Sequence, residues 1–488
     1  MASPLKWECL LSTQRERAGS LPPTNSPIVR NAFEADYDRI VGSSSVRRLQ
    51  DKAQVYPLQQ NDVVRTRLTH SLEVSGMARS LGKAVGYIVQ KKDSTFTSEH
   101  TEKLACLLQV AGLIHDLGNP PFGHYGETVI RRWFENWFSS NAVLAAYNIV
   151  LTEQQQNDFR YFDGNVQNLR IVSKLQTLND TKGANFTYAT LGTIMKYPWS
   201  SVTRPRKKDG KQYEKFGYFL AEESLAKDVQ KTLGLMDGVR HPATYLLEAA
   251  DDIIYLCDDI EDGAKKGLMD WDEEYTRLKE KLATTIEQDP KLQKLFQRID
   301  EKQPEKSMHV QEQKTARVRN FRNITQTFLF EQVVEEFDVH YSEIMSNNPM
   351  PSFELLDCQK PLVSALKELT KEKCFSSHEA LSLELVGDKV ITTLLDIFVH
   401  ALMEHDGATL SDIRTYPGKL FQLISPNFVY IAFATCDNCK CAGTLEEKID
   451  QLPAYNRLLL VTDFISGMTD SYAVNIYQEL MGMKHPTL

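Results

Sequence analysis

The stretch 101-TEKLACLLQVAGLIHDLGNPPFGHYGE-127 decides the fold class of this chain. From Thr101 to Leu117, apolar residues fall on nearly every face of a helix, which predicts a buried central helix. Gly118-Asn119-Pro120-Pro121 then ends the helix, because proline cannot continue the backbone hydrogen-bond ladder. His115 and Asp116 stand at the end of this helix, where two polar side chains are costly unless they are paired or bind a metal.

Helical patterns also dominate the sequence on both sides of this stretch. Periodicity typical of helices runs from about 33 to 140 and over 240–266, 310–345 and 382–488. One extended stretch is expected near 55–58 and one possible strand at Phe428–Thr435. No alternation of strands and helices suggests a parallel sheet. We therefore expect an all-α fold with at most minor β-hairpins.

Three regions are expected along the 488 residues. Residues 1–30 carry Pro22, Pro23 and Pro27 and predict an irregular N-terminal arm. Residues 31–345 would form a helical core, and 346–488 an α-rich C-terminal region that packs on this core. The formal net charge of −9 argues against general binding to DNA or anionic lipid.

The sequence indicates a cytoplasmic protein. The N-terminus lacks a signal-peptide core, and no apolar run is long enough for a membrane span. Most cysteines are scattered, as in reducing compartments. Cys436, Cys439 and Cys441 could bind a soft metal, but a fourth ligand at standard spacing is missing, so a structural or adventitious cluster is the favoured interpretation.

Four residues are candidate metal ligands: His70, His115, Asp116 and Asp251. His70 precedes an apolar-periodic helix, and Asp251 is flanked by Ala and Ile residues, where a solvated acidic face is a poorer explanation than for the acidic residues after it. Two His and two Asp suit Mg²⁺, Mn²⁺ or another transition-metal ion. On an octahedral ion they leave about two positions for water and a substrate oxygen, which favours a hydrolase over a closed structural site.

The order His70, His115-Asp116, Asp251 resembles the H…HD…D pattern of the HD superfamily of phosphohydrolases. Longer segments are similar to the bacterial deoxyguanosine-triphosphate triphosphohydrolases. These segments are RRL at 47–49, QVYP at 54–57, RTRLTHS at 65–71, HDLGNPPFGHYGE at 115–127, GNVQ at 164–167 and SGMTD at 466–470. The matches run from about 36 to 480. The resemblance implies that 31–345 is an HD-type core and that 346–488 completes the family fold.

The family reaction splits a dNTP between the 5′ oxygen and the α-phosphorus, giving a deoxynucleoside and inorganic triphosphate. The resemblance implies one divalent metal ion, dGTP as the preferred substrate, control of dNTP pools and a homo-oligomer, either a tetramer or a hexamer. It assigns the metal ligands to His70, His115, Asp116 and Asp251. It also assigns His124 and Glu127 as a catalytic pair, in which the carboxylate fixes the tautomer of the imidazole and raises its pKa. Whether His124 acts as base or acid stays open.

The same resemblance assigns the substrate contacts. Arg67, Lys196, Tyr197 and Lys215 match segments that hold phosphates, where positive charge must offset the triphosphate. Tyr255 and Asp259 follow Asp251 at i+4 and i+8 and so share its helix face. Tyr255 would block a 2′-OH, Asp259 would accept the sugar 3′-OH, and Gln54 would lie near the sugar.

Two basic segments stand out against the acidic total. Residues 39–67 hold six basic and two acidic side chains, and residues 196–215 hold seven basic and two acidic ones. The resemblance implies that both surround one small polyanion.

Two other function classes stay open. One is another HD-type phosphohydrolase, such as a nucleotidase or a phosphodiesterase. The other is a nucleotide-sensing or single-stranded-DNA-binding HD protein. The basic stretch from Arg204 to Lys211 could bind single-stranded DNA as a secondary role, although a flexible solvated loop is the favoured interpretation.

Overall fold

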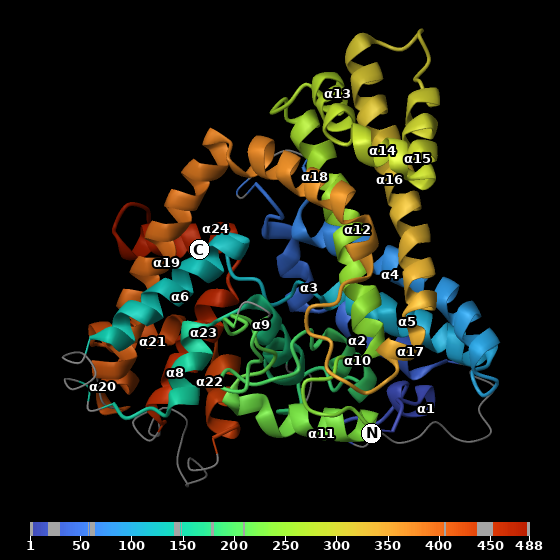
Figure 1. Ribbon diagram of the computed structural model, residues 1–488. Coiled ribbons are helices and arrows are strands. Elements are labelled where there is room, and N and C mark those ends of the chain that lie inside the picture. The colour runs from blue at the N-terminus through green and yellow to red at the C-terminus, as the bar shows by residue number, and fades with distance from the viewer. Residues whose placement is uncertain are drawn as a thin grey trace.

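The chain folds almost entirely as helices. The computed structural model describes residues 3–17, 30–56, 58, 64–140, 147, 149–176, 180–207, 210–404, 407–436 and 452–485. These residues form 23 α-helices, with isolated β-bridges but no β-strand among them (Figure 1). The predicted all-α fold class is therefore confirmed.

The helices carry the labels of Figure 1. The first half of the chain forms α1 (Trp7–Leu10), α2 (Ala32–Val41), α3 (Ser44–Arg48), α4 (Arg67–Lys92), α5 (Ser98–Ile114), α6 (Gly123–Ser139), α8 (Glu153–Arg160), α9 (Gly164–Arg170), α10 (Tyr188–Ile194) and α11 (Glu223–Leu233). The second half forms α12 (Pro242–Lys265), α13 (Trp271–Lys281), α14 (Ala283–Gln288), α15 (Pro290–Glu301), α16 (Val310–Val339), α17 (Tyr341–Ile344), α18 (Lys360–Thr370), α19 (His378–Glu404), α20 (Gly407–Ser411), α21 (Tyr416–Leu423), α22 (Pro426–Ala434), α23 (Ala454–Ser466) and α24 (Asp470–Leu480). Single 3-10 turns are η1 (Leu49–Asp51), η3 (Leu220–Glu222) and η4 (Leu355–Gln359), and π turns are η2 (Ile171–Leu175) and η5 (Lys371–Phe375).

The central pair of helices is α4 and α5, and it positions the site. The helix predicted from the opening stretch is α5, whose residues from Leu104 to Ile114 are buried except Gln109. The two helices approach closely at glycines: a Cβ on Gly82 would lie 2.8 Å from Ala105 Cα, and one on Gly112 would lie 2.8 Å from Ser75 Cα. These contacts show that α4 and α5 run antiparallel. The start of α4 therefore meets the end of α5, and His70 meets His115.

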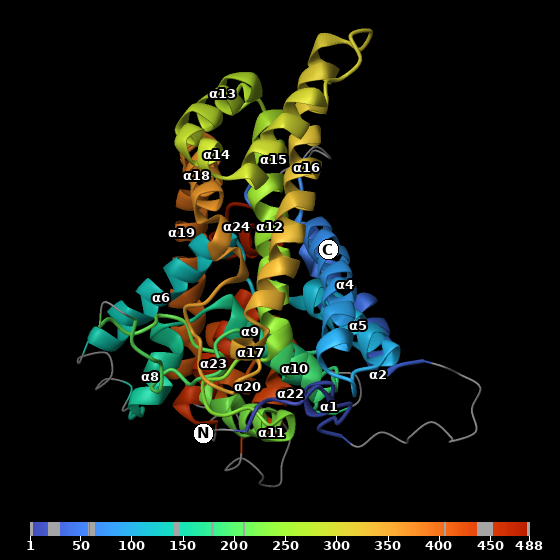
Figure 2. The ribbon, with the colours of Figure 1, turned by 45° about the vertical axis from the view of Figure 1, so that its right-hand side comes forward.

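Two clusters of buried apolar side chains form the interior. The first joins α1–α5 with α10–α18, and the second joins α6 and α8 with α19–α24. Figure 1 shows the second group on the left and α4, α5 and α12 on the right, with α18 and α19 arching between the two sides. Helices α13, α14 and α15 and the first part of α16 project away from the rest, whereas the remainder of α16 packs along α12 and α4 (Figures 1 and 2). The second cluster contains residues from both sides of position 345, and the division into three regions stays a prediction.

One local expectation is wrong. The possible strand at Phe428–Thr435 is helix α22, in which Pro426 stands in the first turn and aromatic and β-branched residues pack against α23. A short apolar run fits either structure, and here burial on both sides accommodates a helix. The N-terminal arm also contains α1, where Trp7 and Leu10 are buried. Such a short helix carries no periodic signal in the sequence.

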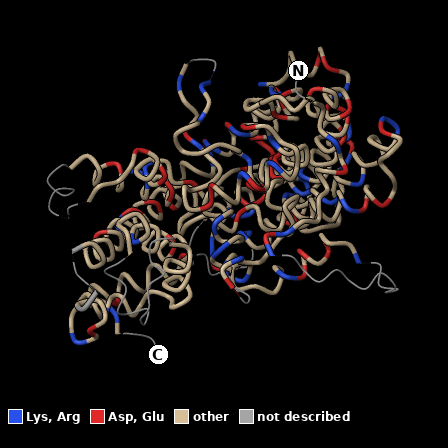
Figure 3. The backbone as a smooth tube through the Cα atoms, turned by 90° about the horizontal axis from the view of Figure 1, so that it is seen from below, with Lys and Arg blue, Asp and Glu red and all other residues tan. Residues whose placement is uncertain are grey.

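Charges are mixed over the fold. Figure 3 shows acidic and basic residues interspersed along the tube rather than gathered on faces of one sign. Among the described residues, no helix combines the length and the apolarity that crossing a bilayer requires.

Candidate active site

His70, His115 and Asp116 form a cluster at the junction of α4 and α5. One ligand atom from each lies within 4.8 Å of the others. Asp251 joins them from α12: its Oδ1 lies 3.1 Å from His70 Nε2 and 3.5 Å from His115 Nε2. Both histidines are buried. The four residues predicted as metal ligands are therefore brought together by three helices.

The hydrogen bonds of this cluster fit a metal ion. His115 Nδ1 lies 2.7 Å from the Gly112 carbonyl oxygen, to which it donates, so in the neutral imidazole Nε2 carries the lone pair. That Nε2 is buried without a hydrogen-bond partner among the described residues, and the nearest atoms are oxygens of Asp116 and Asp251 at 3.5 Å. A lone pair facing two carboxylates is unfavourable unless a cation lies between them. Nitrogen and oxygen donors of this kind suit Mg²⁺, Mn²⁺ and related ions.

The charges in the cluster stabilise one another. Burial opposes a charge on His115, but Asp116 and Asp251 outweigh it and raise the pKa of the imidazole. Burial likewise opposes ionisation of Asp116, yet Arg67 and His115 hold the pKa of that carboxyl below its ordinary value. Asp116 also accepts a hydrogen bond from Asn119 Nδ2 at 2.7 Å. The carboxylate is thus ionised and oriented, as a metal ligand must be.

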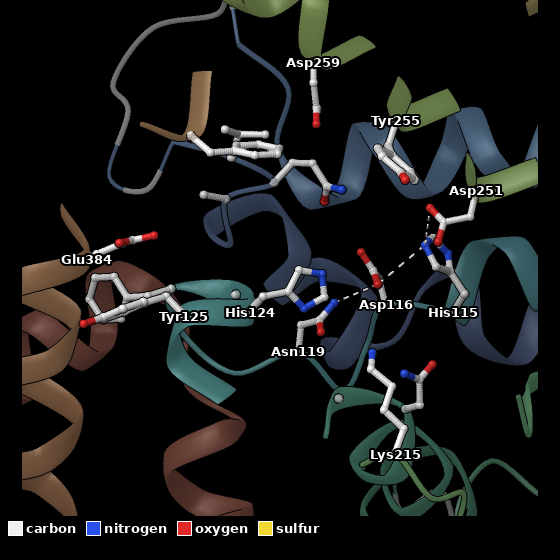
Figure 4. A pocket seen from close by; sticks show the side chains of 18 of the residues that line it. His115, Asp116, Asn119, His124, Tyr125, Lys215, Asp251, Tyr255, Asp259 and Glu384 are labelled. Carbon is white, nitrogen blue, oxygen red and sulfur yellow. Dashed lines mark hydrogen bonds and ion pairs between the residues drawn. The ribbon is translucent and has the colours of Figure 1, made fainter. Parts of the chain in front are cut away.

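A cavity of about 560 Å³ opens beside the cluster. Figure 4 shows His115, Asp116 and Asp251 at one end and Tyr125 and Glu384 at the other. Its walls combine residues packed in both apolar clusters, Phe122 in one and Tyr255 in the other. This volume is typical of a site for a small molecule. Of the predicted site residues, the following line it: Gln54, His115, Asp116, His124, Lys196, Tyr197, Lys215, Asp251, Tyr255 and Asp259.

His124 stands on the cavity wall in the first turn of α6. Its side chain is 77% exposed, and its Nδ1 lies 3.3 Å from Oε2 of the buried Glu127. The charge of Glu127 and this hydrogen bond raise the pKa of His124. The other oxygen of Glu127 accepts a hydrogen bond from Gly164 N at 2.8 Å, which fixes the carboxylate. The pair has an oriented imidazole that can transfer a proton at the cavity.

Two lysines give the cavity positive charge. Lys196 Nζ lies 3.6 Å from Asp251 Oδ2, and Lys215 Nζ lies 3.2 Å from Asp163 Oδ2. Burial opposes their charges, but Asp251 and Asp163 outweigh it and raise the pKa of each ammonium. Tyr197 also lines the cavity, and its ring centroid is 5.8 Å from Lys215 Nζ. Both lysines are therefore charged at neutral pH and available to an anion.

Helix α12 presents Asp251, Tyr255 and Asp259 to the cavity, as their spacing predicted. Burial, with a contribution from Asp262, raises the pKa of Asp259 to about 8. The carboxyl is therefore largely protonated at neutral pH and can donate as well as accept a hydrogen bond. In Figure 4, Tyr255 and Asp259 point into the cavity from the same side.

Comparisons with known proteins agree on one family. The HD domain family matches residues 67–169. A deoxyguanosinetriphosphate triphosphohydrolase-like protein of Listeria monocytogenes is 40% identical over 98% of this chain and 100% of its own length. A protein of the same description from Synechocystis is 32% identical over 98% and 100%. The deoxyguanosinetriphosphate triphosphohydrolase of Yersinia enterocolitica is 30% identical over 93% of this chain and 94% of its own. The chain belongs to the deoxyguanosinetriphosphate triphosphohydrolase-like family.

Three residues assigned from the resemblance to this family lie behind the cavity wall. His70 and Glu127 are buried beside His115 and His124 respectively. Arg67, expected at a phosphate, is also buried, and its guanidinium forms an ion pair with Asp116. In this structure Arg67 supports a metal-ligand candidate and does not line the cavity.

Several residues of the basic segments of this family member form contacts inside the protein. Arg65 pairs with four carboxylates, those of Glu73, Asp258, Glu261 and Asp262. Arg204 is buried over the Tyr161 ring, 3.5 Å from its centroid. Of the basic residues in 39–67 and 196–215, only Lys196 and Lys215 line the cavity among the residues described there. The expectation that both segments surround one polyanion is therefore wrong for most of their members.

Several cavity residues were missed by sequence reasoning. They are Asn119, Phe122, Tyr125, Asn165, Phe375, Ala380 and Glu384. Asn119 and Asn165 stand in quoted family segments and could have been found there. Glu384 lies on α19, 133 positions after Asp251, and belongs to none of the family segments quoted above. The Cys436–Cys441 cluster lies largely outside the described residues, since only Cys436 falls within them, so its role stays a prediction.

Proposed function

We propose that this protein is a metal-dependent dNTP triphosphohydrolase that prefers dGTP and releases a deoxynucleoside and inorganic triphosphate. One observation carries the proposal. A single cavity brings a metal-competent cluster, a polarised His124, two charged lysines and the α12 face within reach of one small molecule.

The donor set would hold one divalent ion through His70, His115, Asp116 and Asp251. When bound, such an ion polarises a phosphoryl oxygen and lowers the pKa of a water molecule. Asn119 and Arg67 would keep the Asp116 carboxylate oriented toward that ion through the contacts described above.

His124 would act as the general acid. In the proposed reaction a water oxygen bonds to the α-phosphorus, the bond from the α-phosphorus to the 5′ oxygen breaks, and that oxygen takes a proton. Glu127 raises the pKa of His124, which favours the protonated imidazole, and the carboxylate stabilises this form until transfer. The proton lost by the water restores the imidazolium after the products leave.

Lys196 and Lys215 would bind the triphosphate. The triphosphate carries about four negative charges at neutral pH, which one divalent ion offsets only by half, and the two ammonium groups supply the remainder. Asp163 and Asp251 hold these lysines in place before substrate arrives, so little ordering remains to be done on binding.

The sugar would lie along α12. Asp259 would bond the 3′-OH, and Tyr255 would occupy the space that a 2′-OH needs. Gln54 faces the same space, and its buried Oε1 has no hydrogen-bond partner among the described residues. A buried acceptor without a donor is costly, so a ligand hydroxyl would relieve it.

The base would lie at the far end, against Tyr125, Phe375 and Glu384. Guanine presents two adjacent donors, N1–H and the N2 amino group. A carboxylate such as Glu384 offers two acceptors, and its pKa is raised by burial with no ion-pair partner among the described residues. Adenine lacks this pair of donors, which supports a preference for dGTP.

The test is product identity. The purified protein would be incubated with each dNTP and Mn²⁺, Mg²⁺ or EDTA, and triphosphate, pyrophosphate and orthophosphate would be separated by ion-exchange chromatography. We expect triphosphate and deoxyguanosine from dGTP with metal and nothing with EDTA. Orthophosphate or pyrophosphate as the first product would instead identify a nucleotidase or another HD-type phosphohydrolase.

Two variants assign the roles. Asp116→Ala and His124→Ala are each expected to abolish triphosphate release, but only Asp116→Ala loses bound Mn²⁺, measured by mass spectrometry of the metal content. Normal turnover by His124→Ala would contradict its role as general acid. The homo-oligomer and the binding of single-stranded DNA stay predictions.

A further inference from the structure

The segment Ser466-Gly467-Met468-Thr469-Asp470 has no part in the chemistry proposed above. It joins α23 to α24, far along the chain from the metal-ligand candidates and beyond the HD domain match, which ends at residue 169. Asp470 and Ser466 are nevertheless buried, with 2% and 0% exposure. Buried polar groups at the end of a chain need partners, and these partners are in the site.

Asp470 accepts hydrogen bonds from the backbone amides of two cavity residues. Its Oδ1 accepts a hydrogen bond from Phe122 N at 2.9 Å, and its Oδ2 accepts one from Ala53 N at 3.0 Å. Ala53 is followed by Gln54. Phe122 has φ of 62°, the left-handed conformation, and precedes the first turn of α6, which carries His124 and Glu127. One carboxylate thus fixes the spacing of two cavity walls.

Lys52 makes the reciprocal link. Its buried ammonium donates to the Asn119 carbonyl oxygen at 2.5 Å and to the Ser466 carbonyl oxygen at 3.0 Å. Asn119 in turn orients Asp116 through its side chain. Lys52 therefore links the loop after α5 to the end of α23. Lys52 also directly precedes Ala53, whose backbone amide donates to Asp470.

We infer that Asp470 and Lys52 are positioning residues that hold the Gln54 loop and the His124 turn at the separation that the reaction requires. This inference rests on the proposed function. The left-handed Phe122 supports it, because a non-glycine residue adopts that backbone only when its surroundings impose it. The segment 466–470 would thus act in turnover through backbone amides and would touch no substrate.

The test compares Asp470→Asn with Ser471→Ala. Asn keeps one acceptor oxygen and replaces the other by an amino group, so one of the two amide bonds is lost at almost unchanged volume. Ser471 neighbours Asp470 but bonds Asp51 on the exposed side, so it tests general disturbance of α24. A misplacement of about 1 Å can cost about 100-fold in rate. We expect kcat of Asp470→Asn for dGTP to fall about 10- to 100-fold, with its Mn²⁺ affinity unchanged.

Amide hydrogen exchange provides a readout that needs no substrate. At least one of the amides of Ala53 and Phe122 should exchange faster in Asp470→Asn than in the wild type and in Ser471→Ala. Normal kcat together with normal protection of both amides would overturn the inference, as would an equal loss in Ser471→Ala. If Asp470→Asn does not fold, Lys52→Gln, which shortens the link to Asn119 and Ser466, is measured in the same way. If the wild type releases no triphosphate but the amides still lose protection in Asp470→Asn, the proposed function is wrong, whereas the link from Asp470 to the two amides is supported.

Discussion

In the proposed reaction His124 would transfer a proton, and Glu127 would hold the imidazole in position. His124 faces the cavity, whereas Glu127 is buried and held by Gly164 N, so the carboxylate stays in place when the imidazole gains or loses a proton. The raised pKa of His124 follows from this arrangement. A general acid of this kind works below its pKa and fails above it.

Glu127→Gln should move the alkaline limb of the kcat profile to lower pH. Removing the charge lowers the pKa of His124 toward its ordinary value, so the protonated form disappears earlier as pH rises. Activity at pH 8 should therefore fall more than activity at pH 6. Glutamine can still accept from Gly164 N, which limits structural disturbance. A pH–rate profile with Mn²⁺ measures the change, and an unshifted alkaline limb would contradict the role of His124 as acid.

Glu384→Gln should reduce the preference for dGTP. The amide keeps one acceptor but loses the charge, and a hydrogen bond to a charged group contributes about 1.5–3 kcal/mol, roughly 10- to 100-fold. We expect kcat/KM to fall for dGTP and to change little for dATP. Ser382→Ala, whose hydroxyl bonds the His378 carbonyl on the exposed side of α19, is the matched control. Equal losses for dGTP and dATP would place the base elsewhere.

At this scale the sequence predicts side chains better than contacts. His70, His115, Asp116 and Asp251 were found because donor type and spacing carry the signal. Asp470 was quoted within a family segment, but its partners are backbone amides, which no residue pattern records. Arg67 was expected at phosphate, and its bond to Asp116 depends on how α4 and α5 pack.

Among the elements, the turn after α5 packs on α9 with almost no space. A Cβ on Gly118 would lie 2.0 Å from the Gly164 carbonyl oxygen and 2.3 Å from Asn168 N. Asn168 also donates to the His115 carbonyl oxygen at 3.1 Å. The absence of a side chain at Gly118 therefore sets how close α9 comes to the metal cluster.

Gly118→Ala should destabilise the protein by about 1–3 kcal/mol or more, because backbone atoms of α9 must move. Gly76→Ala is the opposite case: Gly76 is an exposed residue within α4 with nothing within 4 Å of a new Cβ. That change should stabilise the protein by about 0.5–1 kcal/mol, because alanine has less conformational freedom in the unfolded chain. Denaturant unfolding measures both, and a destabilised Gly76→Ala would contradict the reasoning.

Elements are predictable where their pattern is long. Helix α5 is apolar all round and has a proline stop, so its existence and burial follow from the sequence. Helix α22 has nine residues and a pattern that suits either structure, so its packing against α23 decides. The arch of α18 and α19 over the cavity depends on contacts between distant segments and has no local signal.

For the molecule as a whole, metal binding should stabilise the fold. His70, His115, Asp116 and Asp251 come from three helices, so an ion held by them joins parts of the chain that would separate on unfolding. A ligand that binds only the folded state, at 100 times its Kd, adds about 2.7 kcal/mol. Mn²⁺ should therefore raise the thermal midpoint and EDTA should reverse the rise. Asp116→Ala should show no such response, and a midpoint independent of Mn²⁺ would argue against the site.

The positions of the lysine and arginine side chains tell more about function than the net charge does. The net charge of −9 hides lysines and arginines that bond carboxylates and carbonyls inside the fold, such as Arg65 and Lys52. Two lysines, Lys196 and Lys215, line the cavity, as the resemblance implied.

Helix α12 also limits how this sequence can change in length. The eight steps from Asp251 to Asp259 correspond to about 12 Å along one helix. In the proposed complex, this spacing sets the distance between the metal site and the sugar. Inserting a single residue between the two aspartates would lengthen this spacing by about 1.5 Å and would rotate the following residues by about 100° around the helix axis. An insertion between Asp251 and Tyr255 would therefore turn Tyr255 and Asp259 away from the helix face that carries Asp251.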